Sequence, residues 1–420
     1  MRVLFLAHRL PYPPDKGDKI RSFRELEQLS SRHELDLFCF YDDPNDRRYL
    51  REANRYCRVV YAEPVSWLRS RIRALKALFL GRPFTTAFFY SPTMVRRVRG
   101  AINDRKYDLI FVYGSAVAQY VQGVNHVPRV LDLVDVDSDK WRQYARYSRA
   151  PVSWIWSAEA SRLGEYENRI VREFSMTLVS TLAEADLLRR SGGDARIEHL
   201  ENRFDTTYMD PAKVSVPEEL ASCQPYLIFT GSMDYFPNVD AVEIFCREVF
   251  PCIRAQVPNA QFLIAGRNPT RFVRKLAQRP GVRVTGAVAD IRPYLRGASA
   301  AVAPLRIARG IQTKIFEAMA MNLPVVVSSK AATAMPACLR GQVQIEDDPR
   351  ALARCLIQLL QAKRHESGTA RAALVDYVER TNWKGRWGEL LSRVEPKYLA
   401  KMGPTDGIWL AAPSGQRSSG

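Results

Sequence analysis

The sequence predicts an α/β protein made of two doubly wound parallel sheets. Short apolar runs alternate with helical stretches over the first 200 residues, and the same alternation starts again after Cys223. A chain of 420 residues, 46% hydrophobic and 25% charged, has ordinary globular composition and room for two large domains. Ligands of such sheets bind beyond the carboxyl ends of the strands, so the loops there are the expected site.

The first half of the chain begins with a continuous apolar run from Val3 to Ala7, which predicts a buried parallel strand. A loop over 8–14 and a helix over about 19–31 follow it. Strands alternating with helices imply β-α-β units, so residues 1–205 are assigned to an N-terminal domain. Its further predicted strands are 35–40, 58–61, 109–112, 129–133 and 177–180.

The second half is assigned as a linker over 206–224, a C-terminal domain over 225–378 and a terminal helix over 379–402. The linker is rich in Pro, Glu and Ser from residue 211. Trp383 and Trp387 have helical spacing, so the terminal helix is expected to pack on a domain, with the N-terminal domain as candidate. Gly, Ser and Pro in 403–420 predict a disordered tail. The predicted strands of this half are 226–230, 261–265, 282–285, 300–303 and 324–328.

Charge and cysteine content limit the classes of partner and compartment. The chain has 62 Lys and Arg against 45 acids, a net charge of +17, which favours anionic partners such as nucleotides, phosphosugars, nucleic acid or anionic lipid. The seven cysteines form no C-x-x-C pair, which predicts a reduced, cytoplasmic protein without a cysteine metal site. The N-terminal apolar run is too short for a signal peptide, and no run is long enough to span a membrane.

The most informative stretch is 302–326, where a predicted strand ends in a basic loop, turns at Gly310 and opens a helix. Glycine lets the backbone approach a ligand, and the free N–H groups of Ile311, Gln312 and Thr313 lie at the positive end of the helix dipole. This arrangement predicts a phosphate site.

Lys314 and Glu317 follow Gly310 at i+4 and i+7 and therefore share one helical face. Lysine can neutralise phosphate while glutamate accepts ribose hydroxyls. A solvent-facing ion pair is the alternative for an arbitrary Lys and Glu. The preceding strand and glycine turn favour the ligand site.

The stretch from Gly310 to Val326 resembles the donor-binding signature of glycosyltransferase family 4. These are retaining enzymes with the GT-B fold, in which two Rossmann-like domains face each other across a cleft. Three more blocks, 202–205, 229–233 and 264–269, resemble family segments in the same order. The resemblance implies that Gly231, Ser232 and Gly266 contact the donor.

The loop over 13–21 resembles the family's glycine loop after the first strand, which implies that Gly17 admits the donor diphosphate. The nearest resemblance is to sugar transferases associated with exopolysaccharide biosynthesis. It implies a hexosyl-type transferase that moves sugar from a nucleotide-diphosphate sugar to a glycan or polyprenyl-linked glycan with retention, and that uses no further cofactor, metal or nucleic acid. A nucleotide-sugar epimerase of similar fold and a non-catalytic basic peripheral binding protein are the alternatives.

The chain departs from the family pattern at three positions. Arg309 stands where the family has the first acid of its Glu-x7-Glu motif, and Ser232 and Pro237 stand where it has the Arg and Lys that hold the diphosphate. Other cations must then balance that charge. The candidates are Arg267, which directly follows Gly266, and Arg309, Lys314 and Lys16.

Asp135 and Asp137 form an Asp-x-Asp triplet just after the predicted strand 129–133, which contains Asp132. Asp-x-Asp can hold a divalent ion, but enzymes of the resembling family do not usually use such a metal, and none is expected. Asp135 falls near the position where relatives have a histidine close to the reacting sugar, so it is a candidate catalytic contact. Capping the helix that follows is an equally good role for it.

Residues 67–79 combine apolar side chains with four cations. An amphipathic helix on anionic lipid, which would keep the enzyme near a lipid-linked acceptor, fits this pattern. A plain helix with Leu68, Ile72, Leu75 and Phe79 as its core stripe fits equally well.

Overall fold

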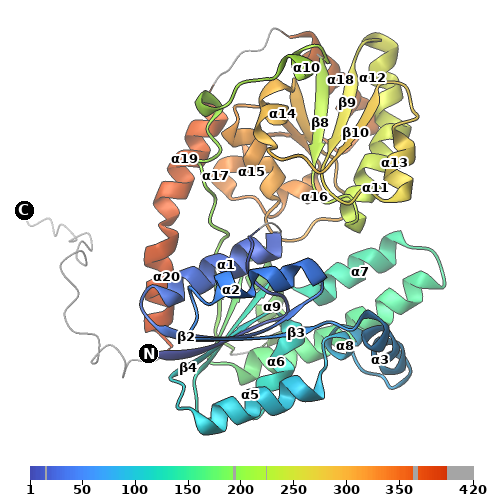
Figure 1. Cartoon of the computed structure of the whole chain (residues 1–420). Helices are drawn as coiled ribbons and strands as arrows, with labels where there is room; N and C mark the ends of the chain where they lie inside the picture. The colour runs from blue at the N-terminus through green and yellow to red at the C-terminus, as the bar shows by residue number, and fades with distance from the viewer. Residues whose placement is uncertain (15–16, 193–194, 224, 363–367, 395–420) are drawn as a thin grey trace, which may run out of the picture.

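The computed structural model describes residues 1–14, 17–192, 195–223, 225–362 and 368–394. It has two parallel sheets, each flanked by helices on both faces, one above the other in Figure 1. The sheet orders are β3-β2-β1-β4-β5-β6-β7 and β10-β9-β8-β11-β12-β13. In both, the chain starts near the centre, builds outward to one edge and then crosses to the other side.

The N-terminal sheet is buried on both faces, which explains why its central strand is an uninterrupted apolar run. In β1, Val3 and Phe5 pack into one core layer while Leu4 and Leu6 pack into the other. The strands are β1 (Arg2–Ala7), β2 (Glu34–Tyr41), β3 (Val59–Pro64), β4 (Leu109–Tyr113), β5 (Arg129–Val134), β6 (Met176–Val179) and β7 (Ile197–His199).

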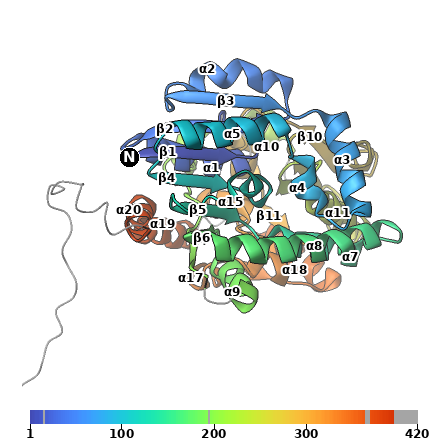
Figure 2. The same cartoon turned by 90° about the horizontal axis from the view of Figure 1, so that it is seen from below.

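The helices of this domain lie between successive strands. They are α1 (Gly17–Ser30), η1 (Pro44–Tyr49), α2 (Leu50–Ala53), α3 (Trp67–Phe79), α4 (Phe84–Phe88), α5 (Pro92–Asp104), α6 (Ser115–Ala118), η2 (Gln119–Val121), α7 (Asp137–Tyr147), α8 (Val152–Glu173) and α9 (Leu182–Gly192). The helices α7 and α8 form a long antiparallel hairpin that projects beyond the sheet (Figure 2).

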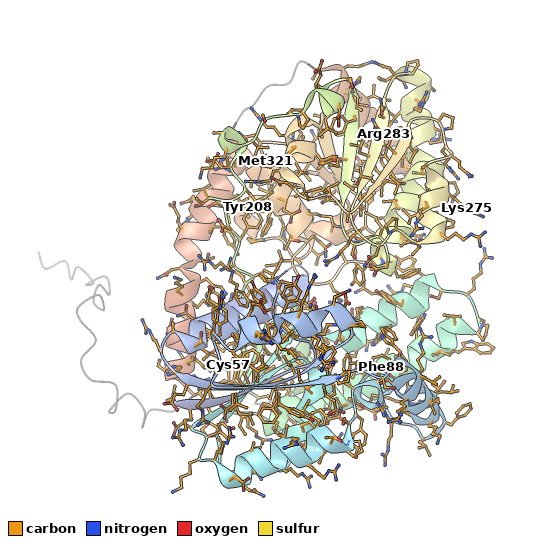
Figure 3. The ribbon with its side chains drawn as sticks, viewed as in Figure 1. Cys57, Phe88, Tyr208, Lys275, Arg283 and Met321 are labelled. Atoms are coloured by element: carbon orange, nitrogen blue, oxygen red, sulfur yellow. The ribbon has the colours of Figure 1, made fainter. Side chains whose placement is uncertain are left out.

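The C-terminal sheet repeats this plan on a separate core. Side chains fill its interior, where Met321 is fully buried, while Lys275 points outward (Figure 3). Its strands are β8 (Tyr226–Thr230), β9 (Gln261–Ala265), β10 (Val282–Gly286), β11 (Ala300–Ala303), β12 (Val325–Val327) and β13 (Gln344–Ile345). Its helices are η3 (Pro211–Lys213), α10 (Glu218–Ala221), α11 (Phe236–Ile244), η4 (Phe245–Val249), α12 (Phe250–Gln256), α13 (Arg271–Leu276), α14 (Arg292–Gly297), α15 (Thr313–Ala320), α16 (Ser329–Ala332), α17 (Ala337–Arg340) and α18 (Pro349–Gln361).

The last two helices connect the domains. Leu374 of α19 (Thr369–Thr381) is buried in the C-terminal core, whereas α20 (Trp383–Ser392) lies against the N-terminal sheet (Figure 1). Trp387 of α20 is 1% exposed, and its ring lies 5.4 Å from that of Phe111 in β4. The terminal tryptophan pattern is thus the packing face of a helix on the first domain.

The differences from the expected elements lie at sheet edges, in the linker and in the terminal helix. In place of one helix over 379–402 the chain forms α19 and α20, which are separated at Asn382, and residues 395–402 lie outside the described residues. The edge strands β7 and β13 have three and two residues, too short and too polar to show an apolar run. The linker contains η3 and α10, and Leu220 belongs to the C-terminal core. The tail predicted to be disordered, 403–420, lies outside the described residues. Among the helices that the structure describes, none is long and apolar enough to cross a membrane.

Candidate functional site

The loops that follow β5 of one sheet and β8 and β11 of the other meet at the domain interface. Gly310, which follows β11, has φ of +58°, and a Cβ there would lie 2.2 Å from Oδ1 of Asp135, which follows β5. Both the backbone conformation and the available space therefore require glycine. The predicted glycine turn and the candidate Asp135 thus face each other across the two domains.

The helix α15 begins three residues after Gly310. Its N-cap, Gln312, makes no side-chain capping bond and instead donates through Nε2 to the Arg309 carbonyl at 2.9 Å. The first N–H groups of α15, with Thr313 exposed at its start, are therefore not satisfied by a side-chain cap. At the other end of the helix, Arg371 of α19 donates to the Ala320 carbonyl at 2.6 Å and so holds the C-terminal end of α15 in place. The start of α15 can thus serve as an anion site.

Lys314 lies in the first turn of α15 and points into its own domain. Its Nζ donates to Oδ1 of Asn238 at 2.6 Å and lies 4.2 Å from the centre of the Phe229 ring. Burial lowers the pKa of Lys314 to about 7, while Glu317 works in the opposite direction. Burial also raises the pKa of Glu317. The pair is thus not the solvent-facing ion pair considered as the alternative, and an entering anion would favour the charged ammonium.

Two glycine loops pack back to back beside Lys314. A Cβ on Gly266 would lie 1.7 Å from the Gly231 carbonyl oxygen, and a Cβ on Gly231 would lie 3.3 Å from Nζ of Lys314. Larger side chains therefore have no room at the ends of β8 and β9. Ser232 donates through Oγ to Asp234 at 2.6 Å.

Asn238 is a site residue that the sequence analysis missed. Its Oδ1 accepts from Lys314, and its Nδ2 donates to the Ser232 carbonyl at 2.9 Å, so it holds the Gly231 turn and the α15 lysine together. Asn238 is 6% exposed in α11, a helix whose other buried residues are mostly apolar. A polar residue at the start of this helix is the only local signal, and its partner lies 76 residues away.

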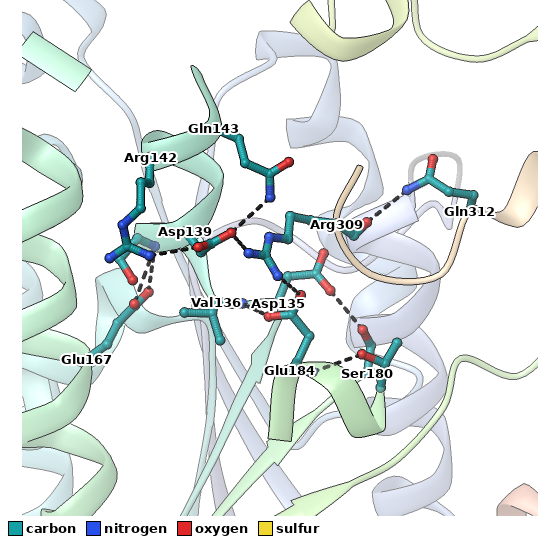
Figure 4. A network of polar contacts seen from close by, with 12 residues as sticks. Asp135, Val136, Asp139, Arg142, Gln143, Glu167, Ser180, Glu184, Arg309 and Gln312 are labelled. Atoms are coloured by element: carbon teal, nitrogen blue, oxygen red, sulfur yellow. Dashed lines mark hydrogen bonds and ion pairs between the residues drawn. The ribbon is translucent and has the colours of Figure 1, made fainter. Parts of the chain in front are cut away.

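Arg309 connects the loop before α15 to the N-terminal domain (Figure 4). Its Nη1 donates to Glu184 Oε1 of α9 at 3.1 Å, and its Nη2 forms an ion pair with Asp139 of α7. Asp139 also accepts from Arg142 and Gln143. Arg309 thus contacts two acids of the facing domain. The sequence analysis named neither acid.

The acids under this loop are buried. Oδ1 of Asp135 accepts from Ser180 Oγ at 2.7 Å, and burial raises the pKa of Asp135. Burial, reinforced by the nearby Asp135 charge, raises the pKa of Glu184 to about 8. The residue at the N-cap of α7 is Val136, not Asp135. The helix cap considered for Asp135 is therefore not formed, and its contact with the reacting sugar stays a prediction.

The other predicted site residues lie around this centre. Arg267 is half-buried in the loop after β9, and its carbonyl accepts from the Met233 N–H at 2.8 Å. Gly17 is the first residue of α1, and a Cβ there would meet open space, so the structure shows no steric need for glycine. Ile311 lines a cavity of about 270 Å³ at the hinge, together with 200–207, Phe316, α19 and α20. Lys16 lies outside the described residues.

Residues 224–362 match the family described as glycosyl transferases group 1. The matched segment contains both glycine loops, Asn238 and the whole of α15. The match spans most of the C-terminal domain, which is therefore similar to group 1 glycosyltransferase domains. The comparison with curated protein sequences found no match.

Solved structures of similar fold cover nearly the whole chain. Sucrose-phosphate synthase from Thermosynechococcus elongatus is 17% identical with a TM-score of 0.67, covering 94% of this chain and 99% of that one. HepE of Anabaena, in complex with UDP and glucose, is 14% identical with a TM-score of 0.62, covering 94% and 100%. The trehalose-6-phosphate phosphatase N-terminal domain of Candida albicans is 13% identical with a TM-score of 0.65, covering 93% and 96%. These similarities confirm the predicted GT-B fold.

Proposed function

We propose that this chain transfers a sugar, with retention of configuration, from a nucleotide-diphosphate sugar to a glycan or polyprenyl-linked glycan in exopolysaccharide biosynthesis. The observation that carries the proposal is the uncapped start of α15, with Lys314 in its first turn, inside a group 1 glycosyltransferase domain. HepE in complex with UDP-glucose and an E. coli protein bound with UDP-2-fluoro glucose have the same fold, which supports a nucleotide-sugar donor.

The donor would lie with its diphosphate at the start of α15. The backbone N–H groups of Gln312 and Thr313 and the ammonium of Lys314 would stabilise the negative charge that develops as the diphosphate leaves, and Arg267 would add a second cation. Glu317 would accept the ribose hydroxyls. Gly231 and Gly266 would let the backbone approach the ligand.

The facing domain would supply the acceptor side of the reaction. Asp135, held by Ser180 against the Gly310 turn, would make a polar contact close to the reacting sugar. Arg309 would stabilise the closed arrangement, because it joins the loop before α15 to Asp139 and Glu184. Tyr144 of α7 and Phe236 of α11 make a second contact between the domains, with ring centres 5.0 Å apart. Closure of this kind excludes water from the reacting centre.

Nucleotide binding provides the first test. UDP, GDP and ADP are compared by thermal shift with a DNA oligomer at the same salt concentration. We expect one nucleotide to raise the melting temperature by several degrees and DNA to have no comparable effect. Stabilisation by DNA alone would contradict the proposal and favour a nucleic-acid-binding protein.

Product analysis provides the second test. A panel of nucleotide sugars is incubated with glycan and lipid-linked acceptors, and products are detected by mass spectrometry. Lys314→Ala and Glu317→Gln should abolish transfer, whereas Lys330→Ala, an exposed lysine of the same domain, should not. Normal turnover by both site variants would show that the donor site is wrongly assigned. Conversion of the donor sugar without an acceptor would indicate an epimerase instead.

A further inference from the structure

The helix α3 turns its large apolar side chains outward. Leu68 is 72% exposed, Leu75 58% and Phe79 81%. The buried residues of the helix are instead Ser70 and Ala77. The stripe that an ordinary helix would bury therefore faces solvent, and the helix packs on the domain through two small residues. The sequence left open whether these side chains form a core stripe, and the structure shows that they do not.

The start of α8 adds to this apolar surface. Trp154 is 71% exposed, with Val152 and Ile155 also exposed beside it. Two contacts bring α8 beside the end of α3: Arg162 donates to the Leu78 carbonyl at 2.8 Å, and Glu159 accepts from the Phe84 N–H at 2.7 Å. Figures 1 and 2 both place α3 next to α8. We call the exposed apolar residues of this region the α3–α8 surface: Trp67, Leu68, Ile72, Leu75, Phe79, Leu80, Val152, Trp154 and Ile155.

The charge on the α3 side of this surface has one sign. No acidic residue occurs in the sequence between Glu63 and Asp104, a stretch that contains α3, α4 and most of α5. The cations of this stretch are Arg69, Arg71, Arg73, Lys76, Arg82, Arg96, Arg97 and Arg99. On α3, Arg69, Arg71 and Lys76 are exposed beside the apolar stripe, and the Arg71 guanidinium lies over the Trp67 ring at 5.4 Å.

From this combination we infer that the α3–α8 surface docks on the surface of an anionic phospholipid bilayer. Leucine, phenylalanine and tryptophan side chains enter the boundary between headgroups and acyl chains, while arginine and lysine contact the headgroup phosphates. Nucleic acid would use the cations but would leave Phe79 and Leu80 in water. The inference rests on exposure and charge alone, so it does not depend on which reaction takes place at the start of α15. If the proposed lipid-linked acceptor is correct, this surface brings the enzyme to it.

The full chain is tested by flotation with two kinds of vesicle, phosphatidylcholine alone and phosphatidylcholine mixed with phosphatidylglycerol. We expect binding to the mixed vesicles only, with affinity that falls as salt is raised. Leu68→Glu and Phe79→Glu, both on exposed positions, should each weaken binding more than tenfold. Phe272→Glu, an apolar residue of the C-terminal domain that is 44% exposed, should bind like the wild type.

The cations are tested separately. Each cation near a membrane surface contributes about fivefold in affinity, so Arg69→Gln with Arg71→Gln should weaken binding by about 25-fold. Arg350→Gln with Arg354→Gln, an exposed pair on α18, should not weaken it.

Unchanged vesicle binding in the α3 variants, or equal binding to neutral vesicles, would overturn the inference. A third result would also overturn it: the wild type is a dimer that does not bind vesicles, and Phe79→Glu converts this dimer to a monomer. Nucleotide thermal shifts of the same variants report on the cleft independently, so failure of one proposal can be told from failure of the other.

Discussion

Binding of a nucleoside diphosphate is expected to weaken as the pH rises above neutrality, because the ammonium of Lys314 must be protonated to bind the anion. Burial lowers the pKa of this group to about 7 in the free protein. A bound diphosphate favours the charged form, so the pKa in the complex is higher than in the free protein. Between the two pKa values, binding takes up a proton, and affinity falls with increasing pH.

The expected magnitude follows from that pKa. At two pH units above the pKa, about one molecule in a hundred carries the proton, so affinity should fall about tenfold per pH unit, or about 1.4 kcal/mol per unit. The measurement belongs above about pH 7.5, where the terminal phosphate, with a second pKa near 6, is already ionised. Titration calorimetry in two buffers of different ionisation enthalpy should show uptake of about one proton per nucleotide at about pH 8.

Two variants isolate the effect. Lys314→Arg keeps a permanent charge, so nucleotide should still bind while the pH slope and the proton uptake disappear. Lys330→Ala removes an exposed lysine of the same domain and should keep the wild-type slope. A wild-type affinity that is constant from about pH 7.5 to about 9.5, or a slope that persists in Lys314→Arg, would refute the reasoning.

Three further changes are predicted. Arg309→Gln removes the ion pair with Asp139 and the hydrogen bond to Glu184 across the domains, at a cost of about 3 kcal/mol to the closed arrangement; donor KM should rise more than kcat falls, and small-angle scattering should show a larger radius of gyration. An unchanged radius would contradict the role of Arg309. Gly266→Ala places a methyl group 1.7 Å from the Gly231 carbonyl oxygen and should weaken nucleotide binding at least about tenfold in titration calorimetry. Gly17→Ala adds a methyl group that meets open space, so it should leave the free energy of unfolding unchanged. Trp387→Ala should lower the free energy of unfolding measured in urea by about 3–5 kcal/mol; an unchanged midpoint would mean that α20 does not stabilise the N-terminal sheet.

The sheet interiors could be predicted because their physical signal is local. Strands such as β8 and β9 are buried on both faces and therefore appear in the sequence as uninterrupted apolar runs, and their bounds agree with the prediction. The edge strand β13 carries no such run, since both of its residues are exposed. It forms because the neighbouring β12 offers free hydrogen-bonding groups, which no pattern within the segment can reveal.

The residues of the candidate site also fall into those that local sequence spacing predicts and those that depend on distant contacts. The spacing of Gly310, Lys314 and Glu317 is set by one turn and one helix, so the sequence was sufficient to place them together. Asn238, the partner of Lys314, lies 76 residues from it in the sequence. Glu184, the partner of Arg309, lies 125 residues from it. Their roles depend on how two sheets and two domains pack.

By itself, the sequence determined the two parallel sheets, the glycine turn that opens α15 and the basic, acid-free character of α3, because each depends on neighbours within a few residues. Only the tertiary structure decided that Arg309 contacts acids of the facing domain and that α3 buries Ser70 and Ala77 rather than its leucines. Helical periodicity defines the faces of a helix but not which of them meets the core. That choice is made by the elements packed against it, which lie far away in the sequence.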